Sequence, residues 1–404
     1  MEATARSHLD PRQRYHGLDA LRAFAMLLGV VLHVALYFQT SEGDAIWPIR
    51  DIERSELAGP LVLVIHIFRM PLFFMMAGFF AAMILERRGS MRFIGNRTLR
   101  IGVPFVIGWF ILFPIVKFSF IFAMIHEGNP DVSESISTAA SMLVYSGAWT
   151  DPVPMHLWFL YYLLILYAAV LGCGLLVQAI TPLRRTWDAA TNFIITSRWR
   201  LPVLIAATFG LLTTMDMPGA DTPVDFIPHL PVLLYYGFFL LVGWALWKHR
   251  ECVAGLHRGC WLRLLIGFVG LGGSTVLMIA YFLAAYERYG LDSTEARLLY
   301  YLTQAAIAIT VWILILGSIG AAERIMRRHH PVIRYLVDAS YWIYLAHLPL
   351  CVFLPALFRT WDVDGTLKML LMIGLVTTLL LLAWQAILGI VPNRAARRPA
   401  AGQA

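Results

Sequence analysis

Two ionisable residues, Arg22 and His33, lie in the first long apolar stretch of the chain. An ionisable side chain inside a membrane span costs roughly 2.5–3.5 kcal/mol on insertion scales, so each one needs a partner or a function. On a helix, their separation places both within about 20° of one face and about 16 Å apart along the axis. The alternative interpretation is that Arg22 reaches the lipid surface and His33 only forms a hydrogen bond inside a helix bundle.

A second pair, His66 and Arg69, is spaced i,i+3 on one turn of the next apolar stretch. Because that helix would run in the opposite direction, we expect the pair at about the depth of His33. A guanidinium does not lose its proton in proteins, so a buried Arg69 requires an anion. This anion is either a substrate group or a protein carboxylate such as Glu53 or Glu56.

Histidine and aromatic residues recur in two later apolar stretches. His347 falls near the middle of one stretch, one turn after Tyr344, and a histidine can act as a general base near neutral pH. His156 and Trp158 open another stretch, where interfacial aromatic residues are common in any case.

Two arginines, Arg97 and Arg100, precede the third apolar stretch. They are either the ordinary positive-inside signal or a clamp for the phosphates of a donor such as coenzyme A. The chain has no G-x-S-x-G motif, and His33 is not followed four residues later by Asp, which disfavours hydrolase and glycerolipid acyltransferase mechanisms. The four cysteines form no C-x-x-C pair, so we predict no metal site and no permanently bound cofactor.

The elements that must position these residues are membrane helices. Of the 404 residues, 59% are hydrophobic and 14% charged, and the mean hydropathy is +0.69, which excludes a water-soluble fold. The absence of period-2 alternation excludes a membrane β-barrel. We predict an all-α, polytopic protein with about ten transmembrane helices of about 20 residues each. The predicted spans are 18–38, 61–85, 101–125, 157–180, 201–215, 229–248, 262–286, 297–320, 336–357 and 367–390.

The charge pattern predicts the topology. Alternate connections are rich in arginine, for example around Arg87 and around Arg327, and by the positive-inside rule they face the cytoplasm together with both termini. We predict a cytoplasmic segment 1–17, one membrane-embedded domain 18–390 and a basic cytoplasmic tail 391–404. The net charge of +7 is explained by this topology, so no nucleic-acid partner is expected.

Six short motifs in register resemble those of the acyltransferase 3 family of membrane proteins, and together they cover most of the chain. They are Leu18-Asp19-Ala20-Leu21-Arg22 with His33, His66-Ile67-Phe68-Arg69, Ala77-Gly78-Phe79-Phe80, Arg97-x-x-Arg100-x-x-x-Pro104, His156-Leu157-Trp158-Phe159-Leu160 and Ser340-Tyr341-x-Ile343-Tyr344-Leu345-x-His347.

The resemblance implies a bacterial inner-membrane enzyme that transfers succinyl from cytoplasmic succinyl-CoA to hydroxyls of osmoregulated periplasmic glucans, with a site open to the periplasm. It makes His33 the catalytic histidine. The predicted catalytic residues are His33, His66, Arg69 and His347. The predicted substrate-binding residues are Asp19, Arg22, Arg97, Arg100, His156, Trp158 and Tyr344.

Two alternatives stay open. One is an acetyltransferase that acts on another cell-surface glycan. The other, from a different class, is a proton-coupled transporter or flippase, in which the same histidines and arginines form a transport path. A transporter is disfavoured because the sequence shows no paired halves with broken helices.

Overall fold

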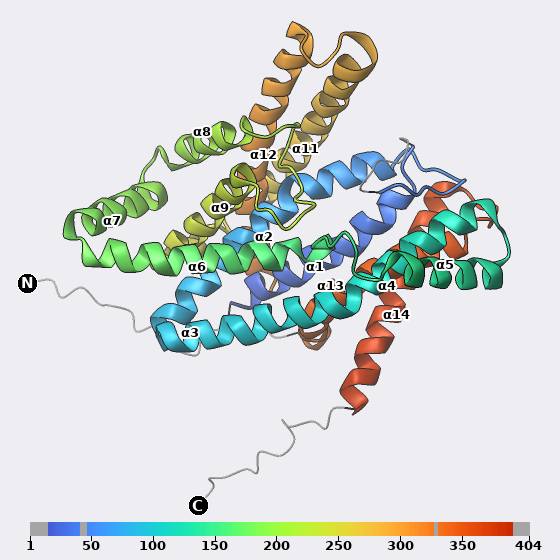
Figure 1. Ribbon diagram of the computed structural model, residues 1–404. Helices are drawn as coiled ribbons and strands as arrows, with labels where there is room; N and C mark the ends of the chain where they lie inside the picture. Colours follow the sequence, from blue (N-terminus) through green and yellow to red (C-terminus); the bar gives the residue numbers. More distant parts are fainter. Residues whose placement is uncertain (1–14, 41–46, 327–329, 391–404) are drawn as a thin grey trace, which may run out of the picture.

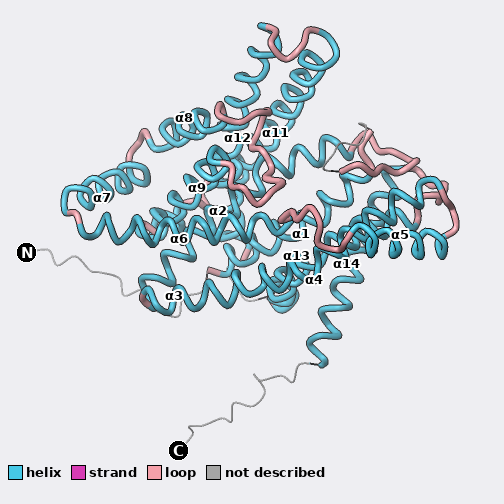
Figure 2. The backbone as a smooth tube through the Cα atoms, in the orientation of Figure 1, coloured by secondary structure: helices cyan, strands magenta, loops and turns pink. Residues whose placement is uncertain are grey.

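The computed structural model describes residues 15–40, 47–326 and 330–390, and within these ranges the chain is helical without strands (Figure 2). The prediction of an all-α, multi-pass membrane protein is confirmed. The predicted terminal segments 1–17 and 391–404 lie largely or wholly outside the described residues. The side of the membrane on which the termini lie remains a prediction.

Most helices follow one another with short connections, and longer connections follow the helices that end at Tyr37 and Leu212 (Figure 1). The first half contains α1 (His16–Tyr37), α2 (Ala58–Arg88), α3 (Ser90–Arg97), η1 (Thr98–Gly102), α4 (Val103–Gly128), α5 (Val132–Ser146), η2 (Met155–Leu157), α6 (Trp158–Ala179) and α7 (Thr181–Thr196). The second half contains α8 (Arg200–Leu212), α9 (Leu230–Lys248), α10 (Glu251–Gly255), α11 (Cys260–Phe282), η3 (Leu283–Arg288), α12 (Thr294–Ile325), α13 (Pro331–Leu357) and α14 (Gly365–Ile390).

Nine helices in the described ranges are long and apolar enough to cross a membrane. The predicted span 201–215 differs, because α8 has only 13 residues. At 1.5 Å per residue it reaches about 20 Å, short of the roughly 30 Å hydrocarbon core. Thr213 ends the helix, and a connection rich in Gly, Pro and Asp follows.

The connection after α8 is held inside the bundle by Gln304 of α12, which is fully buried. Its amide nitrogen donates to the Leu212 and Met217 carbonyls, and its amide oxygen accepts from the Gly219 N–H. Irregular backbone at membrane depth requires such internal partners. The chain therefore turns back within the protein before α9 begins.

The core consists of two adjoining apolar clusters. The larger joins the first half of α1 to α2, α6, α9 and α12, and the smaller joins the second half of α1 to α4, α13 and α14. In the larger cluster α2 and α9 pack backbone to backbone, since a Cβ on Gly78 would overlap the Leu240 carbonyl and one on Gly243 the Met75 carbonyl. Helix α1 contributes residues to both clusters, and its position between them brings its polar residues to the boundary.

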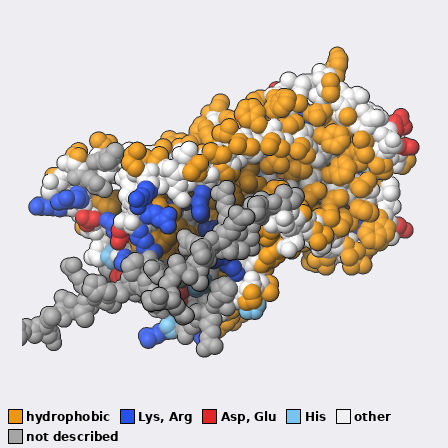
Figure 3. All heavy atoms as spheres, turned by 90° about the horizontal axis from the view of Figure 1, so that it is seen from below, with side chains coloured by type: hydrophobic (Ala, Val, Ile, Leu, Met, Phe, Trp, Pro, Cys, Tyr) orange, Lys and Arg blue, Asp and Glu red, His pale blue; other side chains and the backbone are white. Residues whose placement is uncertain are grey.

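The surface is polarised along the bundle. Figure 3 shows Lys and Arg side chains gathered at one end of the face in view, a broad hydrophobic surface beside them, and acidic side chains at the opposite end. The ion pair between Lys248 at the end of α9 and Asp188 of α7 belongs to the basic end. This segregation is the pattern expected of a membrane protein that follows the positive-inside rule.

Candidate active site

Three histidines from three separate elements meet at the boundary of the two core clusters. The ring of His347 in α13 lies 5.1 Å from that of His33 in α1 and 5.0 Å from that of His156 in η2, measured between centroids. His347 is 1% exposed and His156 is 7% exposed, whereas His33 is half-buried. We call these three residues the histidine cluster.

Backbone carbonyls fix the proton positions on two of these rings. Nδ1 of His347 lies 2.7 Å from the Tyr344 carbonyl, and Nε2 of His156 lies 3.0 Å from the Leu345 carbonyl. Because a carbonyl only accepts, these nitrogens carry the protons in the neutral rings, and His347 Nε2 and His156 Nδ1 keep lone pairs. Both of those nitrogens, and Nδ1 of His33, are buried without a hydrogen-bond partner.

The local sequence explains how His156 enters the cluster. Pro349 has no N–H, so the Leu345 carbonyl four residues earlier loses its helical donor and is free to accept from His156. Met155 has a φ of +50°, an uncommon conformation for a residue other than glycine, and it turns the chain so that His156 points inward. The Tyr344 hydroxyl donates to the His156 carbonyl at 2.9 Å and closes the connection between α13 and η2.

Arg69 lies beside this cluster with its guanidinium buried. Its Nε donates to the Ala25 carbonyl at 2.9 Å, and its Cζ lies 5.7 Å from the Phe73 ring centroid. The lack of a side chain at Gly29 leaves room for the Arg69 guanidinium beside His347. Arg69 Nη2 and His347 Nε2 both lie within 3.5 Å of the point that a Gly29 Cβ would occupy. Within the described ranges no Asp or Glu forms an ion pair with Arg69, so the protein carboxylate considered from the sequence is not found there.

Two other predicted residues of the outer half have structural contacts. His66 Nε2 lies 3.0 Å from the Ala220 carbonyl and 3.5 Å from the Thr222 hydroxyl, so its contacts go to the connection after α8. The Trp158 ring is 7% exposed and packs on Tyr236 and Phe74. These contacts make His66 and Trp158 part of the wall that surrounds the site.

The other predicted residues lie at the basic end of the bundle. Asp19 and Arg22 form an ion pair at 3.5 Å, with Arg22 over the Phe80 ring. Arg97 lies over the rings of Phe93 and Tyr167, and its Nε and Nη2 are buried without hydrogen-bond partners. Donors of this kind fit an anionic ligand.

Arg100 is exposed in η1, a π-helical turn over Thr98–Gly102. Its backbone carbonyl accepts a hydrogen bond of 2.8 Å from the Tyr341 hydroxyl of α13. Single π-helical turns occur frequently at functional sites. The turn places Arg100 on the surface while Arg97 faces the interior.

Sequence reasoning missed two features near the histidine cluster. Trp47 stacks on His33, with ring centroids 5.7 Å apart and an interplanar angle of 22°. Asp51 and Lys368 form a fully buried ion pair at 2.8 Å. The available signal was Lys368 itself, a single cation near the start of an otherwise apolar stretch.

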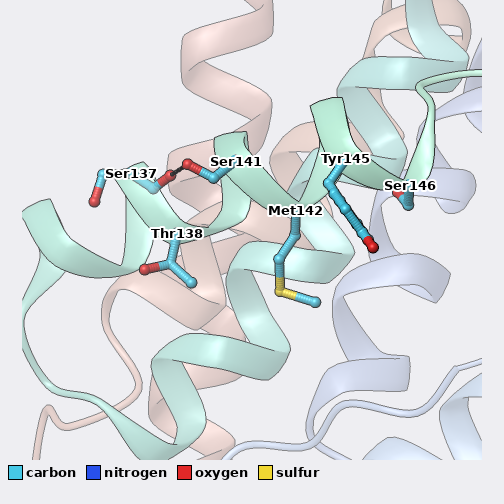
Figure 4. A pocket seen from close by; sticks show the side chains of 6 residues that line it. All are labelled: Ser137, Thr138, Ser141, Met142, Tyr145 and Ser146. Atoms are coloured by element: carbon cyan, nitrogen blue, oxygen red, sulfur yellow. Dashed lines mark hydrogen bonds between the residues drawn. The ribbon is translucent and has the colours of Figure 1, made fainter.

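The described residues form no metal-type cluster, and a surface hollow on α5 differs in chemistry from the histidine cluster. Among the described residues no group of His, Cys, Asp and Glu has the arrangement of a metal site. An open hollow along α5 is lined by Ser137, Thr138, Ser141, Met142, Tyr145 and Ser146 (Figure 4). Figure 4 shows these side chains spread along one exposed helix, without a histidine or a charged group among them.

Comparisons with known proteins show the family of the chain. The sequence profile of the family described as "Acyltransferase domain" matches residues 15–388. Proteins named "Glucans biosynthesis protein C" from Salmonella paratyphi B, Salmonella dublin and Salmonella enteritidis PT4 are each 29% identical over 364 residues, which cover 86% of this chain and 84% of each relative. No solved structure matches the chain.

The family match covers nearly the whole described bundle, including the histidine cluster, Arg69 and the arginines of the basic end. The chain is therefore a multi-pass membrane protein that belongs to the acyltransferase 3 family.

Proposed function

We propose that this acyltransferase moves a succinyl group from cytoplasmic succinyl-CoA onto hydroxyls of a periplasmic glucan. The observation that carries the proposal is a buried Arg69 without a carboxylate partner in the described part of the chain, next to a histidine cluster with unpaired ring nitrogens. The names of the relatives support a glucan acceptor. In this proposal the enzyme lies in the bacterial inner membrane, with both termini cytoplasmic and the site open to the periplasm.

His33 is the proposed general base. Its Nδ1 is buried without a hydrogen-bond partner, and in this proposal Nε2 is the nitrogen that faces the substrate. When the neutral His33 ring carries its proton on Nδ1, Nε2 is unprotonated and can act as the base. His156 extends the cluster by its contact with His347.

The reaction forms one ester bond and breaks one thioester bond. The acceptor hydroxyl oxygen attacks the acyl carbon, and His33 takes the hydroxyl proton. The carbon–sulfur bond then breaks, and the proton passes to the sulfur, which leaves as the thiol of coenzyme A. A variant of this route uses His33 as a transient acyl acceptor before the hydroxyl attacks.

Arg69 is the proposed partner of the free carboxylate of the succinyl group. A guanidinium fits a carboxylate with two parallel hydrogen bonds, and a neutral acyl group offers no such acceptor pair. Its Nε is already bonded to Ala25, so the Nη atoms are the donors left for the substrate.

The donor would bind from the basic end. Arg22, Arg97 and Arg100 would hold the phosphates of coenzyme A, and the unpaired nitrogens of Arg97 are suited to this. The helical rise places His33 about 16 Å further along α1 than Arg22. The pantetheine arm would cover this distance and carry the thioester to the histidine cluster.

The test is the mass and charge of periplasmic glucans from a host that lacks its own glucan acyltransferase. The native chain should add anionic, succinyl-sized groups, and His33→Ala should abolish the addition. His126→Ala is the matched control, because His126 is also buried but bonds Ser135 far from the cluster.

Other results would favour the alternatives. A neutral, acetyl-sized addition by the native chain would make it an acetyltransferase. If the native chain adds succinyl and only Arg69→Ala adds a neutral acyl group, this would support the carboxylate pairing. Unmodified glucans from a well-expressed native chain would refute the glucan assignment. Substrate flux without a new ester bond would then identify a transporter or flippase.

A further inference from the structure

A buried ion pair stands outside the histidine cluster and the basic end. Asp51, in the connection between α1 and α2, contacts Lys368 of α14 at 2.8 Å, and both side chains are fully buried. Lys368 Nζ also donates to the Arg359 carbonyl at 2.8 Å, and Asp51 Oδ1 also accepts from the Glu53 N–H. The pair therefore joins the connection between α1 and α2 to α14 and to the connection that precedes α14.

Burial of the Asp51–Lys368 pair costs free energy, because both charges lose their contact with water. Burial raises the pKa of the Asp51 carboxyl, and its Oδ2 has no hydrogen-bond partner. Apolar residues of similar size in place of a buried ion pair are often neutral or stabilising for a fold. A requirement for position therefore explains the Asp51–Lys368 pair better than a contribution to stability does.

What the pair positions is the segment 47–57. The Asp51 N–H donates to the Tyr37 carbonyl and the Ser55 N–H to the Phe38 carbonyl, so the segment folds onto the end of α1. Arg50 Nη1 donates to the Trp47 and Ile49 carbonyls at 2.7 and 2.8 Å. These bonds fix the backbone at Trp47.

Trp47 in turn contacts the proposed base. Its ring stacks on His33 at 5.7 Å, and it also contacts the Phe120 ring edge-on at 5.2 Å. Trp47 is only 5% exposed, so it is not available as a stacking platform for a sugar. The near-parallel stack restricts the rotation of the His33 ring about its side-chain bonds.

We propose that Trp47, held by the Asp51–Lys368 pair, is a positioning residue that sets the ring plane of His33. The proposal rests on the proposed function of His33. It assigns the segment 47–57 to the catalytic machinery through contact with the base, without contact to substrate.

The test compares Trp47→Ala, Trp47→Phe and the control Trp361→Ala, which alters a half-exposed tryptophan outside the site. Misplacement of a catalytic group can cost about 10- to 100-fold in rate, so Trp47→Ala should lose that much kcat with little change in KM for the acyl-CoA. Trp47→Phe should recover most of the rate, because it keeps a stacking ring.

The ion pair is tested with the double variant Asp51→Leu, Lys368→Met, since single variants leave a buried charge and can unfold. We expect the double variant to fold and to lose kcat as Trp47→Ala does. If Trp47→Ala lowers kcat and the thermal midpoint and raises KM together, its role is structural and the proposal is overturned. Full activity of the double variant would also overturn the proposal.

A chemical readout separates this proposal from the proposed function. Diethyl pyrocarbonate modifies unprotonated imidazole, and peptide mass reports its rate at His33 among the 12 histidines. A changed rate at His33 in Trp47→Ala supports the contact even if the native chain transfers no succinyl. An unchanged rate together with unchanged kcat refutes the positioning role.

Discussion

Replacement of Gly29 by alanine would place a methyl group against both Arg69 and the histidine cluster. The new Cβ would lie 2.6 Å from Arg69 Nη2, 3.3 Å from its Cζ and 3.5 Å from His347 Nε2. Ordinary contact begins at 3.4 Å, so the guanidinium must move by about 0.8 Å. The backbone is not displaced, because the close atoms belong to the end of a side chain.

The size of the effect follows from the hydrogen bond that this movement strains. Arg69 Nε donates to the Ala25 carbonyl at 2.9 Å. A hydrogen bond to a charged group is worth about 1.5–3 kcal/mol, which corresponds to roughly 10- to 150-fold in rate if the bond is lost in the transition state. We therefore expect Gly29→Ala to lower kcat/KM with succinyl-CoA by this factor and to change the thermal midpoint little.

The assay is the initial rate of acyl transfer from succinyl-CoA and from acetyl-CoA by the purified protein in detergent or nanodiscs. The control is Gly272→Ala, because a Cβ on Gly272 meets no atom within 4 Å. The loss should be larger for succinyl than for acetyl if Arg69 binds the free carboxylate. Full succinyl activity in well-folded Gly29→Ala would refute the placement of Arg69 at the reacting acyl group.

Three further predictions follow from the same contacts. Pro349→Ala restores a backbone N–H donor that competes with His156 for the Leu345 carbonyl. We expect kcat to fall about fivefold, which corresponds to the loss of a hydrogen bond worth about 1 kcal/mol. Met155→Gly should keep kcat, whereas Met155→Ile should lower both kcat and the thermal midpoint, since a β-branched residue disfavours the φ of +50°. Arg97→Gln should raise KM for the acyl-CoA at least tenfold with kcat retained, and an unchanged KM would remove Arg97 from the donor site.

Hydropathy and charge determined the architecture from the sequence. Apolar stretches of about 20 residues cannot remain in water, so the all-α, multi-pass fold follows from composition and run length. The cost of burying ionisable groups also singled out His33, Arg69 and His347. The structure brings these three together across Gly29.

Other elements departed from the sequence pattern for identifiable reasons. The predicted span 201–215 became the short helix α8, because backbone groups of Leu212, Met217 and Gly219 find partners in Gln304 of a distant helix. His66 forms a hydrogen bond with Ala220, a residue far along the chain that the sequence pattern does not reveal, and its catalytic role stays a prediction. Hydropathy averages over neighbours in sequence and carries no information on such partners.

The sequence by itself determined which residue types enter the membrane and in which order. Only the tertiary structure decided which of them are in contact. His156 contacts His347 because Pro349 leaves a backbone carbonyl free to bind His156. Trp47 contacts His33 in a segment that the Asp51–Lys368 pair holds in place. The physical reason is that burial is a property of each segment, whereas these contacts depend on how separate helices pack. Side-chain partners at that range are set by shape and by the need to satisfy buried polar groups.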